Sequence, residues 1–220
     1  MQNNRRVFLI SASALVLAGC GGLGLGPANP DEAIYVLQPA LTTPPQGVTP
    51  TTWALAIDIP DASDALDTRR IALIKDDNTL DYYANAQWPD RLPMLVQTAL
   101  LAAFQASGKV PSASRTQDAL HSDFELGVEV RDFAAHYGSS DDKGKPSGNP
   151  KVTVTLIAQM TTAHGRKILA NFTASQSADA SQNSTGAVVQ AFNTALGAAV
   201  QQIVGWSLGL TLPAMTPTTP

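Results

Sequence analysis

Cysteine and positive charge are both scarce in this chain. Its 220 residues contain one cysteine, Cys20, and 14 lysine and arginine side chains against 18 aspartates and glutamates. A single cysteine excludes an internal disulfide and a zinc site built from several thiolates. The formal charge of −4, without a cluster of lysines or arginines in the sequence, argues against nucleic acid as a partner and against electrostatic attachment to an anionic membrane surface.

The signatures of common enzymes are also missing from the sequence. The three histidines, His121, His136 and His164, lie apart and form no His-x-x-x-His pair for zinc. There is neither the Gly-x-Ser-x-Gly turn of many hydrolases nor a phosphate-binding glycine loop between a strand and a helix. We therefore expect no enzyme, no metal and no dissociable cofactor.

The first twenty residues have the organisation of a bacterial lipoprotein signal peptide. Arg5 and Arg6 precede a short apolar run over residues 7–16. The run ends in Leu17, Ala18, Gly19 and Cys20, which resembles a lipobox, whose cysteine becomes the mature N-terminus and carries acyl chains. We expect a signal peptide over residues 1–19 and a covalent diacylglycerol and N-acyl (palmitate) lipid on Cys20. The alternatives are an ordinary signal peptide with an incidental cysteine and an uncleaved anchor, but the run is too short to span about 30 Å of hydrocarbon.

Composition divides the mature chain into a tether, one domain and a tail. Without Arg5 and Arg6 it has 12 basic and 18 acidic side chains, a formal charge of −6. The glycine-rich residues 20–31 predict a flexible tether behind the lipid. Residues 32–210 suffice for one domain, and the Pro/Thr-rich residues 211–220 predict a disordered tail. Within the domain, residues 39–50 and 141–150 are expected to be a loop and a hairpin tip.

Patterns with a period of two predict that strands dominate the domain. Apolar and polar residues alternate over residues 52–59, 124–131 and 152–159, and residues 167–175 look like another strand. Residues 70–74 and 79–84 flank a turn-forming Asp-Asp-Asn sequence, as in a hairpin. Short connections between the last three strands predict an antiparallel meander.

Two helices follow from the 3.6-residue period. The first begins at Pro93, where a proline costs little, and ends before Gly108. The second runs from Ser184 to about Trp206, and the chain carries no charge beyond residue 180. Its amides and hydroxyls disfavour a membrane span. Its uncharged outer face indicates either contact with another protein or a helix that its own domain covers. The elements together predict an α/β (α+β) single domain, an antiparallel-rich mixed sheet with both helices packed on one face.

Two groups of acidic residues have only a weak resemblance to functional sites. Asp61, Asp64 and Asp67 have calcium-like spacing but lack the turn glycine and closing glutamate of an EF-hand loop, which favours a polar surface loop. Glu125 and Glu129 share one strand face, which the alternation places in solvent, so acid–base work by this pair is a weak hypothesis.

The aromatic residues offer a candidate partner interface. Tyr82, Tyr83 and Trp88 crowd into seven residues before the first helix, and Trp206 ends the second helix and could pack beside them. Large rigid side chains concentrate binding energy at interfaces. The alternative is that they pack in the core and at its edge.

The order of these pieces resembles a known family. Ile57-Asp-Ile-Pro60 is followed by the Arg70-Ile71 strand, Tyr82-Tyr83, Trp88, the Pro93 helix, the strand from Phe124 to Phe133 and the terminal helix with Trp206. Over residues 31–208 this is similar to the ABC-type transport auxiliary lipoproteins, the PqiC-like family of periplasmic lipoproteins.

The resemblance implies a non-catalytic lipoprotein on the periplasmic face of the outer membrane. Such proteins work with the permease and ATPase of inner-membrane ABC transporters and with MCE-domain proteins that conduct lipid across the periplasm, and relatives assemble as homo-oligomeric rings. Gly21 agrees with outer-membrane sorting, because aspartate at that position retains lipoproteins in the inner membrane. The implied function is a docking component of a lipid transport system. The alternative is a stand-alone lipid-binding periplasmic lipoprotein. A cryptic hydrolase would need clustered histidines and acids, which the sequence scatters.

Overall fold

The computed structural model describes residues 32–41, 49–118, 120–141, 143–163 and 167–213. The predicted signal peptide, lipobox with Cys20 and tether lie outside the described residues, as do His164, most of the Pro-rich stretch and the tail beyond residue 213. The predictions made for these segments, and the domain boundaries, stay predictions.

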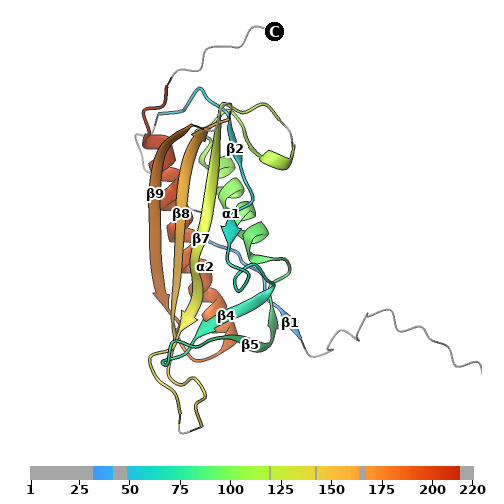
Figure 1. The fold of residues 1–220 in the computed structure, drawn as a ribbon, viewed down its shortest axis with the longest axis vertical. Coiled ribbons are helices and arrows are strands. Elements are labelled where there is room, and N and C mark those ends of the chain that lie inside the picture. Colours follow the sequence, from blue (N-terminus) through green and yellow to red (C-terminus); the bar gives the residue numbers. More distant parts are fainter. Residues whose placement is uncertain (1–31, 42–48, 119, 142, 164–166, 214–220) are drawn as a thin grey trace, which may run out of the picture. The chain divides into compact units, whose positions relative to one another are not determined.

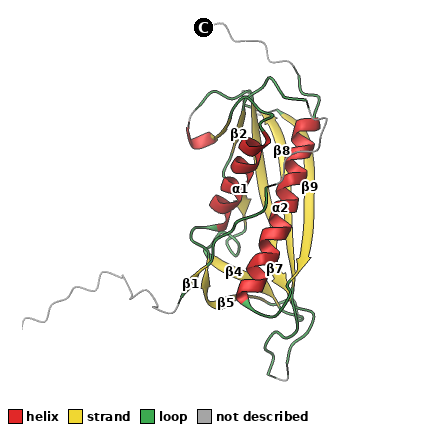
Figure 2. Cartoon of the chain, turned by 180° about the vertical axis from the view of Figure 1, so that it is seen from behind, coloured by secondary structure: helices red, strands yellow, loops and turns green. Residues whose placement is uncertain are grey.

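The described part of the chain forms one α+β domain with a nine-stranded mixed sheet (Figures 1 and 2). The elements are β1 (Ala33–Ile34), β2 (Leu55–Ile57), β3 (Asp61–Ala62), β4 (Arg70–Ile74), β5 (Leu80–Gln87), α1 (Leu92–Ser107), β6 (Ala113–Arg115), a 3-10 turn (Thr116–Asp118), β7 (Phe124–His136), β8 (Lys151–Thr162), β9 (Ile168–Asp179) and α2 (Thr185–Gly209). Both long helices lie on the same face of the curved sheet, as Figure 2 shows, which confirms the predicted layers.

The sheet is organised around β7. One edge of β7 pairs with β8 in antiparallel fashion along its length, from Phe124 opposite Thr162 to His136 opposite Lys151. The other edge pairs in turn with β2, β3 and β4, and all three pairs are parallel. Parallel strands need long crossover connections, and the segments that separate β2, β3 and β4 from β7, α1 among them, supply these connections.

The prediction of an antiparallel-rich sheet is wrong. Five of the eight strand pairs among the described residues are parallel, and only β4–β5, β7–β8 and β8–β9 are antiparallel. The connections β4–β5 and β8–β9 are short, and the longer connection from β7 to β8 is dense in turn-forming residues, so all three pairs are readable from the sequence. The predicted hairpin over residues 70–84 and the meander of the last three strands are confirmed.

A β-bulge divides β7 into two halves: even-numbered residues face the core before the bulge, and odd-numbered residues face it after the bulge. Phe124, Leu126, Val128 and Val130 are buried, as the alternation predicts. The register with β8 then shifts between Val130 and Asp132, which leaves Arg131 as the extra residue. Beyond the bulge, Phe133 and Ala135 occupy the core face. A regular strand would have placed Asp132 there instead.

β2 departs from its predicted alternation. The regular strand covers only Leu55–Ile57, and all three of its residues are buried, whereas Ile59 is 44% exposed. The reason is its place in the sheet, because β2 lies between β6 and β7. Leu55, Ala56 and Ile57 are all buried, so both faces of this short strand are covered and it has no polar face.

The two helices begin and end close to the predicted residues. α1 starts at Leu92 with Pro93 in its first turn, and it ends before Gly108, whose φ of 60° is left-handed. The Ser184 side chain caps α2 by accepting the N–H of Ala187 at 3.4 Å. α2 is long and apolar enough to cross a membrane, but 67% of its most apolar window is buried inside the domain. It is therefore a core helix.

The chain itself covers much of the uncharged outer face of α2. The N–H of Gln38 donates to Asn193 Oδ1 at 2.7 Å, and Gln201 Nε2 donates to the Ala40 carbonyl at 3.2 Å. Between them, at Gly197, the helix backbone approaches Ala40 closely. The covered-helix alternative therefore holds for this part of the face, and no second protein is needed to explain it.

Candidate functional site

Trp88 belongs to the core. Its side chain is 1% exposed and packs edge-on against Phe133 and Phe192, with ring centroids 6.3 and 5.5 Å away. The rings of Phe133 and Phe192 stack on each other at 4.7 Å. A buried side chain cannot present a surface to a partner, so Trp88 is removed from the predicted interface.

Trp206 does not join the tyrosines either. It is half-buried and stacks on Phe172 of β9, with 5.4 Å between the ring centroids. Trp206 lies 21 positions beyond Thr185 in α2, about 30 Å along the helix at 1.5 Å per residue. Tyr83 shares a cleft with Thr185 at the other end of that helix. The prediction that Trp206 packs beside the aromatic block is therefore wrong.

Tyr82 and Tyr83 of β5 line a cleft of about 450 Å³ at one end of the domain. Three segments form it: the β4–β5 hairpin, the connection between β7 and β8, and the start of α2. We call it the lysine cleft, and its polar lining includes Lys75, Tyr83, Tyr137, Lys143, Lys145 and Ser184.

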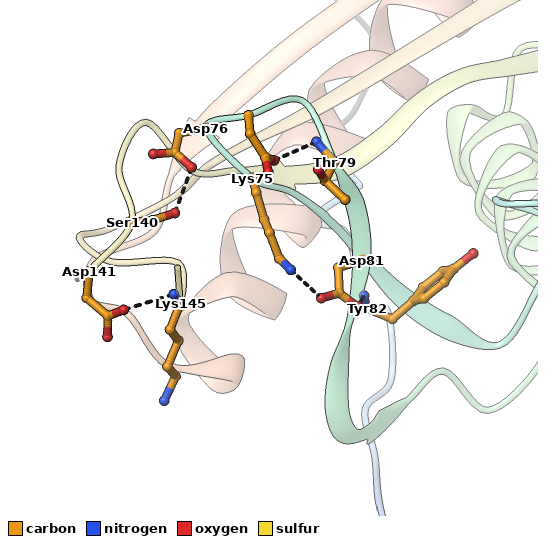
Figure 3. A network of polar contacts seen from close by, with 9 residues as sticks. Lys75, Asp76, Thr79, Asp81, Tyr82, Ser140, Asp141 and Lys145 are labelled. Carbon is orange, nitrogen blue, oxygen red and sulfur yellow. Dashed lines mark hydrogen bonds and ion pairs between the residues drawn. The ribbon is translucent and has the colours of Figure 1, made fainter. Parts of the chain in front are cut away.

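Hydrogen bonds hold the two loops of the lysine cleft against each other. Ser140 Oγ donates to Asp76 Oδ1 at 2.6 Å and thus links the β7–β8 connection to the turn of the hairpin (Figure 3). The Asp141 carboxylate accepts the backbone N–H groups of Lys143 and Lys145, at 3.0 and 2.9 Å. These bonds shape the loop so that both lysines come to line the cleft.

A chain of hydroxyl and amide groups crosses the cleft wall. Tyr83 Oη and Tyr137 Oη are 2.8 Å apart, and Tyr137 Oη donates to Asn183 Oδ1 at 2.7 Å. Because Tyr137 has one hydroxyl proton, Tyr83 must be the donor to Tyr137. Burial, with the hydrogen bond to Tyr137 as the smaller cause, raises the pKa of Tyr83 above its usual value. Tyr83 is therefore neutral at physiological pH.

Lys75 is the one lysine of the cleft that has an ionic partner among the described residues. Its Nζ lies 2.8 Å from Asp81 Oδ2 (Figure 3). The hydrogen bond to Asp81 raises the pKa of Lys75, and the same bond, together with the Tyr82 N–H, lowers the pKa of Asp81. Both groups are charged at neutral pH and compensate each other.

A second, acidic cleft of about 440 Å³ lies against the part of the sheet that carries Gly127, Gln159 and Asn171. Asp58, Asp61 and Glu129 line it. Two of these carboxylates already have protein partners, since Asp58 accepts the Thr116 hydroxyl at 2.9 Å and Glu129 pairs with Arg131 at 2.9 Å.

The other candidate groups from the sequence do not converge. Asp67 pairs with Arg91, and the described residues contain no group of three histidine, cysteine, aspartate or glutamate side chains that could hold a metal. His121 precedes β7 and His136 ends it, where its Nε2 lies 2.9 Å from Asp132 Oδ2. Strands rise about 3.3 Å per residue, so the two histidines are far apart.

Reasoning from the sequence missed most of the lysine cleft. Tyr83, Tyr137 and Asn183 are 54 and 46 residues apart in the chain, so no local motif connects them. Three of the six lysines of the chain line this one cleft, although the sequence shows no basic cluster. A turn-rich stretch containing two lysines was the one available signal.

The fold places the chain among single-domain α+β proteins that have been solved before. Protein XCC0632 from Xanthomonas campestris, a DUF330 protein, is 26% identical, with a TM-score of 0.71 over 80% of this chain and 94% of that one. Another solved structure, of an uncharacterized protein, is 14% identical, has a TM-score of 0.57 over 71% of this chain and 93% of that one, and shares the fold.

The family follows from the sequence match. The model of the ABC-type transport auxiliary lipoprotein component matches residues 35–204, so the chain belongs to this family. Its description names transport rather than catalysis. The uncharacterized protein bll6063 of Bradyrhizobium diazoefficiens is 26% identical over 194 residues. The match takes in 88% of this chain and 49% of bll6063, so the chain spans about half the length of that relative.

Proposed function

We propose that this chain is a lipoprotein of the outer membrane that docks an ABC transporter–MCE lipid transport system at its periplasmic face. The observation that carries the proposal is the family match over residues 35–204. The lipobox ending at Cys20 supports a lipid anchor, and Gly21 supports sorting to the outer membrane.

The physical mechanism of this proposal is tethering. Each buried CH₂ of an acyl chain contributes about 0.8 kcal/mol, and several chains hold the protein firmly on the membrane. Residues 20–31 connect that anchor to the domain. Confinement near the membrane raises the effective concentration of the domain for an MCE-domain partner, so modest contact affinity suffices. Tyr82 and Tyr83 remain candidate contacts, because both are half-buried rather than enclosed.

The anchor is tested with two variants that leave the described domain unchanged. Cys20→Ala is expected to remove the lipid, the outer-membrane location and transport function, because no thiol remains to be acylated. Gly21→Asp is the matched control, and it is expected to keep the lipid but to fractionate with the inner membrane. Membrane fractionation and labelling with radioactive palmitate measure both effects. A Cys20→Ala variant that still fractionates with the outer membrane contradicts the proposal.

A further inference from the structure

β9 forms a long free edge of the sheet. Among the described residues it pairs only with β8, and it lies at the side of the domain in Figure 1. The strand covers Ile168–Asp179, whereas the terminal strands of the rest of the sheet, β6 and β1, cover three and two residues. An edge strand presents unpaired N–H and C=O groups, which are a template for pairing with another strand.

The backbone groups on the free edge belong to odd-numbered residues. The N–H of Ala180 donates to the Pro150 carbonyl at 3.0 Å, in the same register as the β8–β9 ladder. Hydrogen-bonded pairs alternate along an antiparallel ladder, so the even-numbered residues from Ala170 onward direct their backbone groups to β8. The odd-numbered residues direct theirs outward, and their side chains are all exposed: Asn171, Thr173, Ser175, Ser177 and Asp179.

This edge lacks the devices that usually keep edge strands from pairing. Natural proteins protect long edges with charged side chains, prolines or bulges. From Ala170 to Ala178, β9 contains no charged residue and no proline, and its register with β8 is regular. The free edge of β9 is therefore open to a further strand in a way that the short strands β1 and β6 are not.

The edge of β9 is complementary to itself. In an antiparallel pair of two β9 strands centred on Ser175, every outward residue lies opposite another one, and Asn171 lies opposite Asp179 of the second copy. The outward groups then form about ten hydrogen bonds between the copies. Gln159 donates to Asn171 Oδ1 at 3.0 Å, which leaves Asn171 Nδ2 to donate to that Asp179 carboxylate. Asp179 has no ionic partner within the described part of its own chain.

The position of α2 leaves room for a second copy. A two-fold axis perpendicular to the sheet keeps the helices of both copies on the same face. α2 crosses the sheet obliquely (Figure 2), from Thr185, which lines a cleft with Tyr137 at the end of β7, to Trp206, which stacks on Phe172 of β9. Antiparallel pairing sets the start of one β9 beside the end of the other, where α2 lies farther from the edge. The two α2 helices therefore avoid each other.

We propose that two copies of this chain pair through the free edges of β9, in antiparallel fashion, with Ser175 on the two-fold axis. A second β9 matches this edge in length, in its uncharged composition and in its end groups, which favours a second copy over a strand of another protein. Both copies use the same surface, so the assembly closes after two copies. It differs from the ring that the family resemblance implies, because a ring joins different surfaces head to tail. The pairing does not depend on the transport partner proposed above.

Cross-linking at the axis tests the pairing in the full chain, purified in a neutral detergent. In Ser175→Cys the two positions lie opposite each other, with Cα atoms about 5.5 Å apart, which is within reach of a disulfide. Thr155→Cys is the matched control, because Thr155 lies opposite Ser175 in β8 and its two copies are three strand spacings, about 14 Å, apart. The parent chain controls for cross-linking at Cys20. Mild oxidation should give a disulfide-linked dimer for Ser175→Cys alone.

Loss of one edge N–H tests the same contact without a new thiol. Ser175→Pro removes an N–H that points away from β8, a position at which an edge strand tolerates proline. Its dimer dissociation constant should rise at least about tenfold, because hydrogen bonds on the axis are lost. Ser175→Ala is the matched control, since it keeps the N–H, and its dissociation constant should stay within about twofold of the parent. Analytical ultracentrifugation measures both.

The outcomes separate a paired edge from the alternatives. A dimer that cross-links through Ser175→Cys and dissociates in Ser175→Pro supports the proposal. A monomeric parent chain, a ring whose β9 edges do not cross-link, or equal cross-linking of Thr155→Cys overturns it. Cross-linking of Ser175→Cys in whole cell envelopes to a different protein, without the homodimer, also overturns it. Circular dichroism verifies that the proline variant keeps the fold, and the cysteine variants test the pairing independently of it.

Discussion

Gly197 shows how one residue bears on the position of a segment far earlier in the chain, around Ala40. A Cβ at this position would lie 3.1 Å from the Ala40 carbonyl oxygen and 3.5 Å from the Ala40 nitrogen. A side chain here would push the Ala40 backbone away by a few tenths of an ångström, so glycine suits this close approach to α2. Asn193 and Gln201, on either side, hold the same segment through hydrogen bonds. The conformation of α2 at this position is helical, so the requirement concerns space rather than φ.

Substitution of Gly197 is expected to destabilise the domain. Gly197→Val should lower the free energy of unfolding by about 1–3 kcal/mol, because the added methyl groups overfill a close backbone contact. Gly205→Val is the matched control, since a Cβ there meets no atom within 4 Å, and its effect should stay within about 0.5 kcal/mol. Urea unfolding measures both. Equal losses in the two variants would show that the contact with Ala40 does not matter.

At the scale of elements, the bulge in β7 reconciles a period-two sequence with the core. Val130 and Phe133 both face the core although they are three residues apart, because Arg131 is the extra residue. Phe133 thereby reaches Trp88 and Phe192. The alternation over residues 124–131 was readable from the sequence. The bulge was not, because an exposed arginine in a strand has no distinctive local pattern.

Alanine substitutions at the two residues that follow the bulge test which of them faces the core. Phe133→Ala should cost about 3–5 kcal/mol of unfolding free energy, because it empties a large site in the core. Asp132→Ala should cost less than about 1 kcal/mol, since Asp132 is half-buried and its partner His136 is partly exposed. Chemical denaturation of both variants gives the comparison. A larger loss of unfolding free energy for Asp132→Ala than for Phe133→Ala would contradict this assignment, because it would mean that Asp132 occupies the core instead of Phe133.

At the scale of the whole molecule, local patterns predicted the helices, the hairpin and the meander, while non-local pairing decided the rest. β7 pairs with β2, β3 and β4 in parallel fashion. No tight turn connects these strands, so no turn residue in the sequence indicates that they pair. Contacts between distant segments also explain why the sequence did not predict the composition of the candidate site. Trp88 was grouped with Tyr82 and Tyr83 by proximity in the sequence, but its side chain belongs to the core, whereas the lysine cleft unites residues from three separate segments.

The central claim is that the domain docks a transport system rather than carrying lipid alone. The most direct measurement is affinity purification of the full chain, with a C-terminal tag, from cross-linked cell envelopes, followed by mass spectrometry. Recovery of an MCE-domain protein with the permease and ATPase, and its loss in Cys20→Ala, is the predicted result. Recovery of the chain without these proteins, but with one bound lipid per molecule, would contradict the claim and favour a stand-alone carrier.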